Sequence, residues 1–553
     1  MTLALWAAAV VLLLGVLILA HELGHFLVAK LFGVKVLRFS LGFGPRLFGF
    51  QAGATEYRLS LIPLGGYLRL LGEDPSEPVP AQDLDRALYA RPLWQRYAIV
   101  AAGPIFNLLL PVGIYFLHYM GHKTLPSPTI GTVITGLPAD KAGLVPGDRV
   151  ESIDGNYIRY WEDLEGIIAR SPNKTMRFGI RRGNQSEERD VTTMATVRKG
   201  SLNINETVGL IGVSPRFQLP EIGIVDLTSP AAQAGLRTFD YIISVNGSPV
   251  SHWAEFERAV QRAGASPLRI TYLRGSHSVV PFVHVEIQEP GAAVVLPQPV
   301  LEPTGGRRYE TGIQTSELFV YSVEPGSPAD RIGLRRGDQL LELDGRPILH
   351  WNLLLQRLNA EPERVFHLTW ASPGGVRHRA TFKQELRSEI DAYRQEEQRL
   401  VFGATNCFAW KTADPVPVRN RLFYALGHSL MRTGEIVKFT VQGFLQILSG
   451  EMSLQSLGGF ITIGYAAGVA AEQGLAQYLR LMAFLSINIG LLNFLPIPIL
   501  DGGLLLFFTI ELFKRRPPSA RARTITTYIG VAVVALLVLY ALKNDVVRFF
   551  LPR

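Results

Sequence analysis

The sequence predicts a multi-pass α-helical membrane protein with about four transmembrane helices and three small α+β modules outside the bilayer. Two observations predict this fold class. Apolar residues gather in four long runs, and a pattern of residues recurs three times between the second and third runs. The composition agrees, since hydrophobic residues make up 48% of the chain and the mean hydropathy is +0.18.

The four apolar runs are each close to the length of a membrane span. A helix needs about 20 residues to cross roughly 30 Å of hydrocarbon. The runs cover residues 3–20, 98–119, 481–513 and 529–542. The first run lacks a basic segment before it and a small-residue cleavage site after it, so we expect a retained helix and not a secretory signal.

The charged residues indicate which side of the membrane each segment faces. The net charge is +8, but the basic residues are scattered, which argues against a nucleic-acid partner. Basic residues follow the first run, precede the second and separate the last two, and the positive-inside rule places these segments in the cytoplasm. Both termini and residues 122–470 are then extracytoplasmic.

Cys407 is the only cysteine, so no intrachain disulfide can form.

The repeated pattern has the same internal spacing in each of its three copies. Each copy contains a Gly-Leu pair, an aspartate, an Asp-Gly or Asn-Gly pair and a tryptophan, at Gly143, Asp148, Asp154 and Trp161, at Gly235, Asp240, Asn246 and Trp253, and at Gly333, Asp338, Asp344 and Trp351. The alternating strand before each Asp-Gly or Asn-Gly pair predicts a tight hairpin. Copies 92 and 98 residues apart are separate small domains, larger than solenoid repeats.

Two of the copies resemble the PDZ domains of bacterial proteases. The resemblance is carried by Pro-Ala-Asp-Lys-Ala-Gly-Leu-Val-Pro-Gly-Asp at 138–148 and by Ser-Pro-Ala-Asp-Arg-Ile-Gly-Leu-Arg-Arg-Gly-Asp at 327–338. The middle copy departs from it, because no glycine precedes Asp240. The resemblance implies that the modules capture an extended peptide by strand addition. The alternative is that one or more of them act as spacers or size filters.

A metal-binding pattern lies at the end of the first apolar run. His21 and His25 are four residues apart, so on a helix both imidazoles project from one face. With Glu22 they form His-Glu-x-x-His, the zinc-protease signature in which the glutamate lies beside the metal-bound water. Glu22 is the only acidic residue among the first 55, and an ionisable residue at the end of a span is costly unless it has a function.

A catalytic zinc usually takes three protein ligands, and Asp501 is the candidate for the third. It is the only acidic residue between Glu472 and Glu511, in the segment Asn-Phe-Leu-Pro-Ile-Pro-Ile-Leu-Asp-Gly-Gly. Its prolines and glycines predict a broken helix, and broken helices in a bilayer usually line a site. His21 and Asp501 each lie about 20 residues into a span that enters from outside, so both are expected near the cytoplasmic face.

With both motifs present, the chain resembles the site-2 protease family of intramembrane zinc metalloproteases (peptidase M50 type), most closely its bacterial branch, the regulators of sigma-E. The resemblance implies Zn²⁺ on His21, His25 and Asp501, Glu22 as the catalytic base, and substrate handling by Asn488 and Asn493. Packing between helices is an equally ordinary role for these two asparagines. Residues 102–107 (Ala-Gly-Pro-Ile-Phe-Asn) also match the family.

The resemblance further implies membrane-associated β-hairpins within residues 38–70, which could pair with an unwound substrate. Two features depart from the branch: this chain has three modules where two are common, and Gly-Gly-Phe-Ile at 458–461 replaces Gly-Pro-Ile. The implied location is the bacterial inner membrane, with periplasmic PDZ modules. The implied partners are the lipid bilayer, single-pass membrane proteins or remnant signal peptides as substrates, and an upstream protease that trims them.

These inferences divide the chain into consecutive segments. The expected segments are a first span with His-Glu-x-x-His (1–28), a cytoplasmic or membrane-dipping β region (29–90), a second span (91–120), the PDZ-like modules (122–204, 205–296 and 309–386) with a linker (297–308), an extracytoplasmic amphipathic helical region (387–474), a broken third span (475–513), a cytoplasmic loop (514–523) and a fourth span (524–544). A fifth span within residues 418–449 is disfavoured by its charges.

Two other classes of function would use some of the same features. A PDZ-bearing membrane scaffold could retain the fold without activity, but a scaffold has no need of His21, Glu22, His25 and Asp501 together. A metal transporter would also place histidines and carboxylates within spans. It predicts polar residues along a path through the membrane, whereas these gather at one depth.

Overall fold

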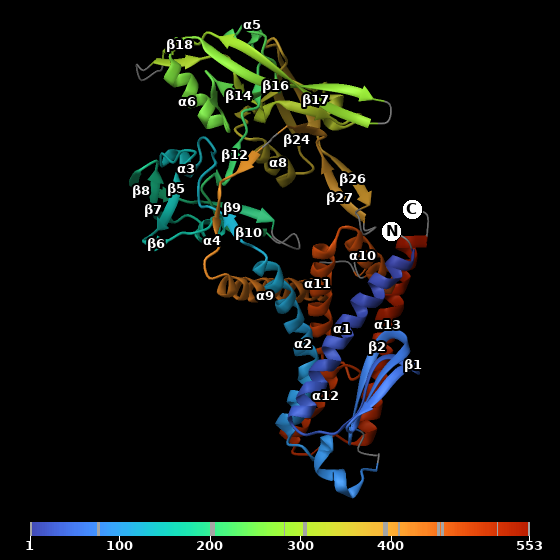
Figure 1. The fold of residues 1–553 in the computed structure, drawn as a ribbon. Helices are drawn as coiled ribbons and strands as arrows, with labels where there is room; N and C mark the ends of the chain where they lie inside the picture. The colour runs from blue at the N-terminus through green and yellow to red at the C-terminus, as the bar shows by residue number, and fades with distance from the viewer. Residues whose placement is uncertain are drawn as a thin grey trace. The chain divides into compact units, whose positions relative to one another are not determined.

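The structure is a computed structural model that describes residues 3–73, 78–199, 205–280, 283–301, 307–390, 396–407, 410–450, 454, 458–516 and 518–550. The chain forms two compact units. The helical unit contains residues 1–123, 390–396 and 418–553, and the repeat unit contains residues 124–389 and 397–417 (Figure 1). Each unit has its own core, and each is described separately.

Long apolar helices dominate the helical unit. Its helices are α1 (Leu3–Leu31), α2 (Leu93–Met120), α9 (Arg421–Ser449), α10 (Phe460–Glu472), α11 (Leu475–Asn493), α12 (Asp501–Lys514) and α13 (Ala520–Phe550). Within the described part of the chain, the segments long and apolar enough to cross a membrane lie in α1, α2, α11 and α13. This confirms the expected number of four. Helix α9 is not among them; it packs against α2 and α11.

Small residues let α1 and α2 approach each other closely. An ideal Cβ on Gly24 would lie 2.3 Å from the carbonyl oxygen of Ala102, and one on Gly490 of α11 would lie 3.1 Å from the carbonyl oxygen of Pro104. Close backbone approach through small residues is the usual basis of helix packing in membranes. Helices α1, α2 and α11 therefore form one tightly packed bundle, with Leu13 and Leu17 fully buried in its core.

The segment after α1 is a β-structure, as expected. Strands β1 (Val36–Ala52) and β2 (Thr55–Leu70) are antiparallel and fold back on themselves, so that Arg38 pairs with both Glu56 and Arg69. Residues 66–70 form an outer strand of this small sheet, paired with β1 on one side. The short helices η1 (Ala81–Arg86) and η2 (Leu88–Ala90) follow and lead into α2.

The third expected span is broken, as its prolines and glycines predicted. Helix α11 ends at Asn493 and α12 begins at Asp501. Ideal Cβ atoms on Gly502 and Gly503 would lie 2.1 Å from the carbonyl oxygen of Leu495 and 2.4 Å from Cα of Pro498. The two glycines are required because the connecting loop folds back against the first turn of α12.

The repeat unit consists of three modules with the same topology. Module 1 contains β4 (Thr132–Val133), α3 (Pro138–Lys141), β5 (Arg149–Ile153), β6 (Asn156–Tyr157), α4 (Trp161–Ala169), β7 (Thr175–Arg182), β8 (Gln185–Thr192) and β11 (Val213–Ser214). Module 2 contains β13 (Ile222–Gly223), α5 (Pro230–Gln233), β14 (Tyr241–Val245), β15 (Ser248–Pro249), α6 (Trp253–Ala263), β16 (Leu268–Val280), β17 (Val283–Val295) and β20 (Gln314–Thr315). Module 3 contains β21 (Val320–Val323), α7 (Pro328–Arg331), β22 (Gln339–Leu343), β23 (Arg346–Pro347), α8 (Trp351–Ala360), β24 (Val365–Ala371), β25 (Arg377–Lys383) and β28 (Ala404–Asn406).

The hairpin predicted in each copy is confirmed. Strands β5, β14 and β22 each turn into a short partner strand through the Asp-Gly or Asn-Gly pair, and both residues of each pair have positive φ, as a two-residue hairpin turn requires. The tryptophan that follows begins the longer helix of the module. A four-residue helix precedes each Gly-Leu pair.

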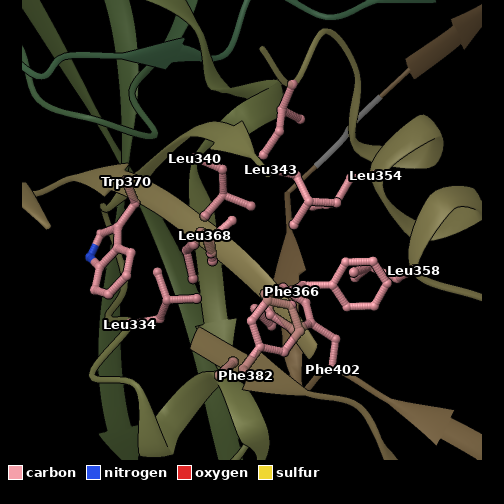
Figure 2. Close-up of a cluster of buried hydrophobic side chains, with 14 of the residues drawn as sticks. Leu334, Leu340, Leu343, Leu354, Leu358, Phe366, Leu368, Trp370, Phe382 and Phe402 are labelled. Atoms are coloured by element: carbon pink, nitrogen blue, oxygen red, sulfur yellow. The ribbon is translucent and has the colours of Figure 1, made fainter. Parts of the chain in front are cut away.

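Each module has its own hydrophobic core. In module 3, Phe366 and Leu368 of β24 face Leu340 and Leu343 of β22, and Leu358 closes the core from α8 (Figure 2). All five side chains are buried. Phe402, which lies just before β28, belongs to the same cluster.

The modules end later than the sequence predicted. The expected ends at 204, 296 and 386 fall before the closing strands β11, β20 and β28, which pair with β4, β13 and β21. Each closing strand follows a glycine of positive φ, namely Gly212, Gly312 and Gly403, packed against the residue that precedes the short helix. The repeat pattern marks the middle of each module, whereas the last strand returns from a distance to complete the core.

Two further expectations are corrected in the same region. The linker expected at 297–308 carries the hairpin of β18 (Gln298–Leu301) and β19 (Arg307–Glu310); residues 302–306 lie outside the described part. The region expected to be helical from 387 begins with strands: β26 (Glu385–Ile390), β27 (Glu396–Val401), β28, β29 (Trp410–Thr412) and β30 (Pro415–Pro417) precede α9. Strand β29 pairs with β12 (Arg216–Gln218), and β30 with β3 (Thr124–Pro126), so this segment completes the repeat unit.

Candidate metal centre

Two histidines of α1 face helix α2 at the point of closest packing. The His21 and His25 rings are 4.8 Å apart between centroids, as expected for side chains one helical turn apart. Gly103 of α2 lies directly opposite them, and an ideal Cβ there would lie 2.2 Å from Nε2 of His25 and 2.8 Å from Cε1 of His21. The space that both imidazoles occupy therefore exists because position 103 has no side chain.

Asp501 reaches the same place from the other end of the chain. It is the first residue of α12, where a carboxylate interacts favourably with the helix dipole. The loop after α11 and the close packing at Gly502 and Gly503 fix this helix start. Contacts between α12 and α2 complete the arrangement, including the paired hydrogen bonds of 2.6 and 3.1 Å from Arg96 of α2 to Glu511. The broken span thus delivers its carboxylate to the histidines.

The three side chains converge with the spacing of metal ligands. Oδ2 of Asp501 lies 3.1 Å from Nε2 of His21 and 3.5 Å from Nε2 of His25, and the two nitrogens are 3.2 Å apart. Ligand atoms at the corners of a tetrahedron lie roughly 3.3 Å apart when the bonds to the ion are about 2.0–2.1 Å long. Oδ2 of Asp501 is buried and has no hydrogen-bond donor among the residues that the structure describes. Two imidazoles and one carboxylate form a donor set that suits zinc and leaves a fourth position open.

The outer nitrogens of both histidines have neighbours that orient the rings. Nδ1 of His25 lies 2.8 Å from the carbonyl oxygen of Ile99 and donates to it, so that Nε2 is free to act as a ligand. Nδ1 of His21 lies 3.4 Å from the amide nitrogen of Asn107, which is fully buried in α2. Within the described part of the chain, Oδ1 of Asn107 has no hydrogen-bond partner. Turning this amide by 180° gives Nδ1–H of His21 its acceptor. Asn107 therefore fits the role of a residue that orients His21.

A cavity of about 600 Å³ opens beside the three side chains. Glu22 lines it together with the outer strand of β2 at Gly66 and Tyr67. Gly66 lies against Glu22, since an ideal Cβ would be 3.2 Å from its Cγ and 2.7 Å from Cγ2 of Ile18. The cavity thus brings a carboxylate, the three converging side chains and the edge of a β-strand together.

The structure separates the two asparagines that the sequence grouped. Asn493 lies at the end of α11, with Nδ2 3.5 Å from Nδ1 of His21. Asn488 instead donates to the carbonyl oxygen of Phe484, one turn back in its own helix, at 2.8 Å. Neither geometry tests a contact with substrate. The substrate-handling role of both residues stays a prediction.

Sequence reasoning did not assign the functions of Gly103, Asn107 and Ile99. Asn107 carries a detectable signal, because a side-chain amide in the middle of an apolar span is costly unless it has a partner. Gly103 and the carbonyl of Ile99 carry no such signal, since a small residue and a backbone oxygen occur in every apolar helix. Their roles follow only from the positions of the histidines.

Comparison with known proteins finds relatives among zinc metalloproteases. The sequence pattern of Peptidase family M50 matches residues 9–537. A protein of Ralstonia nicotianae that carries the name zinc metalloprotease is 30% identical, and the alignment covers 99% of each chain. The Regulator of sigma-E protease RseP of Escherichia coli K12 is 27% identical over 98% of this chain and 99% of its own. Among solved structures, the PDZ domain of the SdrC-like protein of Listeria monocytogenes is 20% identical, covering 17% of this chain and 90% of that one, with a TM-score of 0.14.

A helical membrane protein with His-Glu-x-x-His and a converging aspartate is, as a class, a zinc metalloendopeptidase. The match over most of its length makes the assignment specific: the chain belongs to Peptidase family M50.

Proposed function

We propose that this enzyme cleaves peptide bonds within the membrane-spanning segments of other proteins. The observation that carries the proposal is the convergence of His21, His25 and Asp501 within 3.1–3.5 Å of one another. The helix that carries both histidines, α1, and the helix opposite them, α2, are long and apolar enough to span a membrane. These three residues would hold Zn²⁺. The donor set, the spacing and the burial of Oδ2 of Asp501 beside the two imidazoles support this assignment.

Each residue of the site has a distinct chemical role. Zinc, when bound, polarises the scissile carbonyl and lowers the pKa of a water molecule. Glu22 takes a proton from the attacking water and passes it to the leaving amine, so that no covalent enzyme intermediate forms. Ile99 and Asn107 keep the imidazoles of His25 and His21 in the orientation that presents Nε2.

A substrate helix must be unwound before it can react, and the sheet beside the site supports a way to hold it. Freed backbone groups need hydrogen-bond partners at membrane depth. Residues 66–70 pair with β1 on one side and line the cavity next to Glu22 at Gly66. An extended substrate segment would add to this outer strand, with its scissile carbonyl near the metal ligands.

The substrates that fit are single-pass membrane proteins or remnant signal peptides that another protease has already shortened. Three modules within residues 124–417 would exclude bulky ectodomains, and relatives over nearly the whole length carry the name regulator of sigma-E protease. The positive-inside rule supports an extracytoplasmic position for the modules and a site near the cytoplasmic face of the membrane. The enzyme would then lie in a bacterial inner membrane and act in regulated intramembrane proteolysis.

The decisive experiment is the cleavage of a tagged single-span substrate with a short ectodomain. It compares the wild type with Glu22→Gln at matched zinc content. We expect the substitution to lower the cleavage rate by roughly 10²–10⁴-fold, since it removes the general base and keeps the side-chain volume. Equal absence of product from both metal-loaded proteins, over a panel of diverse substrates, would favour the scaffold function.

The preference for shortened substrates has a separate test. The same single-span segment is presented with a short ectodomain and with a folded domain fused to it. Faster cleavage of the short form supports exclusion by the modules. Equal rates for the two forms would remove the need for an upstream protease while leaving the metal centre unaffected.

A further inference from the structure

The second module departs from the other two at one backbone position. The residue before the repeated aspartate is Gly147 in module 1, with a φ of +100°, and Gly337 in module 3, with a φ of +93°. In module 2 it is Phe239, with a φ of +75°. A bulky residue in this left-handed region is a genuine outlier, because its Cβ crowds the backbone.

The fold imposes this conformation on all three modules. The backbone N–H of Gly147 donates to Ile130 at 2.8 Å, that of Phe239 to Ile222 at 2.7 Å, and that of Gly337 to Val320 at 2.8 Å. The bond ties the loop to the strand that enters the module. Phe239 therefore cannot relax its backbone without losing a hydrogen bond that every copy makes. A strained residue held in this way often has a role outside its own loop.

The phenyl ring of Phe239 contacts module 3. Its centroid lies 5.3 Å from that of Tyr321 on β21, with the planes at 83°, a favourable edge-to-face pair. The guanidinium of Arg336 lies 4.6 Å from the Phe239 ring and 4.0 Å from the Tyr321 ring, within cation–π distance of both. Nη1 of Arg336 also donates to the carbonyl oxygen of Tyr321 at 3.1 Å, which fixes the guanidinium in place.

Further bonds between the same two modules surround this cluster. Nε2 of Gln339 donates to Oε1 of Gln314 at 2.6 Å, and the backbone N–H of Gly374 donates to Val225 at 2.8 Å. The connection between the modules is short and held down, because Glu317 accepts from the backbone N–H of Trp351 at 3.1 Å. At the equivalent position of module 1, an ideal Cβ on Gly147 meets no atom of the described residues within 4 Å.

We propose that Phe239, Arg336 and Tyr321 form an interface that holds modules 2 and 3 together as one rigid body. Module 2 has a strained phenylalanine in place of glycine because the ring is needed by its neighbour. The partner of this surface is the third module of the same chain, and the contact is between the corresponding loops of two repeats. Any peptide capture or size exclusion by module 2 is then coupled to the position of module 3.

The test measures the distance between the two modules in the full-length protein. Cys407→Ser removes the only cysteine, and Glu257→Cys on α6 with Gln356→Cys on α8 provides two exposed sites for spin labels. Double electron–electron resonance then reports the distance distribution. We expect a single narrow distribution for the labelled parent and a broad one after Arg336→Ala, Phe239→Ala or Phe239→Gly. Arg335→Ala, which removes the neighbouring exposed arginine, is the matched control and leaves the distribution narrow.

A second measurement separates strain from contact. Phe239→Ala removes the ring and keeps a Cβ in the left-handed region, whereas Phe239→Gly removes both. Hydrogen–deuterium exchange of β14 is expected to be about tenfold slower in the glycine variant than in the alanine variant. A distribution that stays as narrow as the parent's after Arg336→Ala, which leaves module 2 unaltered, would overturn the proposal. Equal exchange rates of β14 in the two Phe239 variants would show that the backbone at position 239 is not strained.

Discussion

The metal centre and the repeated modules are built in opposite ways. The candidate metal centre gathers His21 and Asp501, which are 480 positions apart, and its motifs occur once in the sequence. The modules form the same hairpin three times from residues that are neighbours in the sequence. In the centre, the side chains can meet only because glycines leave room for them. In the modules, the structure depends mainly on the turn and strand preferences of neighbouring residues.

This difference predicts how each region responds to change. A single added methyl group can abolish the function of the centre, since no second copy compensates. A comparable change in a module lowers only the stability of that module, and the other copies provide internal controls. The four tests that follow run from the largest expected effect to the smallest.

Gly103→Ala is expected to abolish the metal centre although it removes no functional group. The new Cβ would lie 2.2 Å from Nε2 of His25 and 2.8 Å from Cε1 of His21, so both imidazoles must leave their present positions beside Asp501 or α2 must shift. We expect at least about a 100-fold loss of cleavage and loss of bound zinc, measured by elemental analysis of the purified protein. Gly113→Ala on the same helix meets nothing within 4 Å and should keep both. Full activity of Gly103→Ala would contradict the packing described for α1 and α2.

Asn107→Ala tests the orientation of His21 by a neighbour. Loss of a residue that orients a metal ligand typically weakens metal affinity by about 10–100-fold. The affinity is measured by competition for zinc with a chelator. Asn488→Ala is the matched control, because the Asn488 amide bonds to its own helix at 2.8 Å, and it should leave zinc affinity unchanged. Equal losses for the two variants would mean that Asn107 acts only in helix packing.

Arg182→Met tests a repeated ion pair of the modules. Arg182 donates two hydrogen bonds of 2.8 Å to the fully buried Asp148, and Arg274 bonds Asp240 in the same way in module 2. Leaving Asp148 buried without its guanidinium partner should destabilise module 1 by about 2 kcal/mol, which corresponds to about thirtyfold faster exchange of β5 amides. Arg181→Met, whose partner Glu151 is on the surface, is the control and should have little effect. Module 3 serves as an internal control. The substitution lies in module 1, and in module 3 Ser372 occupies the position equivalent to Arg182. Exchange in module 3 should therefore not change.

Asp344→Asn tests the smallest effect, the charge of one turn residue. Burial raises the pKa of Asp344, but the backbone N–H of His367 and the guanidinium groups of Arg364 and Arg357 lower it below its ordinary value overall. A lowered pKa means that the charged form stabilises module 3 at neutral pH and that this stability is lost as the pH falls below about 4. The variant should lose less stability than the wild type in that range.

Asparagine is a conservative replacement at this turn because module 2 already has it. Oδ1 of Asn246 accepts from Arg269 at 2.8 Å, as Oδ1 of Asp344 accepts from His367 at 2.9 Å. The substitution thus keeps the turn and removes the charge together with the Oδ2 acceptor that pairs with Arg357 and Arg364. Hydrogen exchange of β22, corrected for the intrinsic effect of pH, measures the result. An acid response identical to that of the wild type would show that another carboxylate controls the stability of module 3.

The sequence by itself determined the elements whose causes are local. The four spans follow from the apolar runs, the three hairpins from the Asp-Gly and Asn-Gly pairs, and the break before Asp501 from its prolines and glycines. The candidate metal ligands were also readable, because histidines one turn apart and an isolated aspartate in apolar helices have few other uses.

Only the tertiary structure decided what depends on proximity between distant residues. The ends of the modules were predicted too early, because the strands that close them at β11, β20 and β28 return after segments with no repeated pattern. The structural need for Gly103, the pairing of Asn107 with His21 and the contact of Phe239 with Arg336 have the same origin. Helix, strand and turn preferences depend on neighbouring residues and can be read from the sequence. The space around a side chain and the partner that it contacts are determined only when the chain has folded.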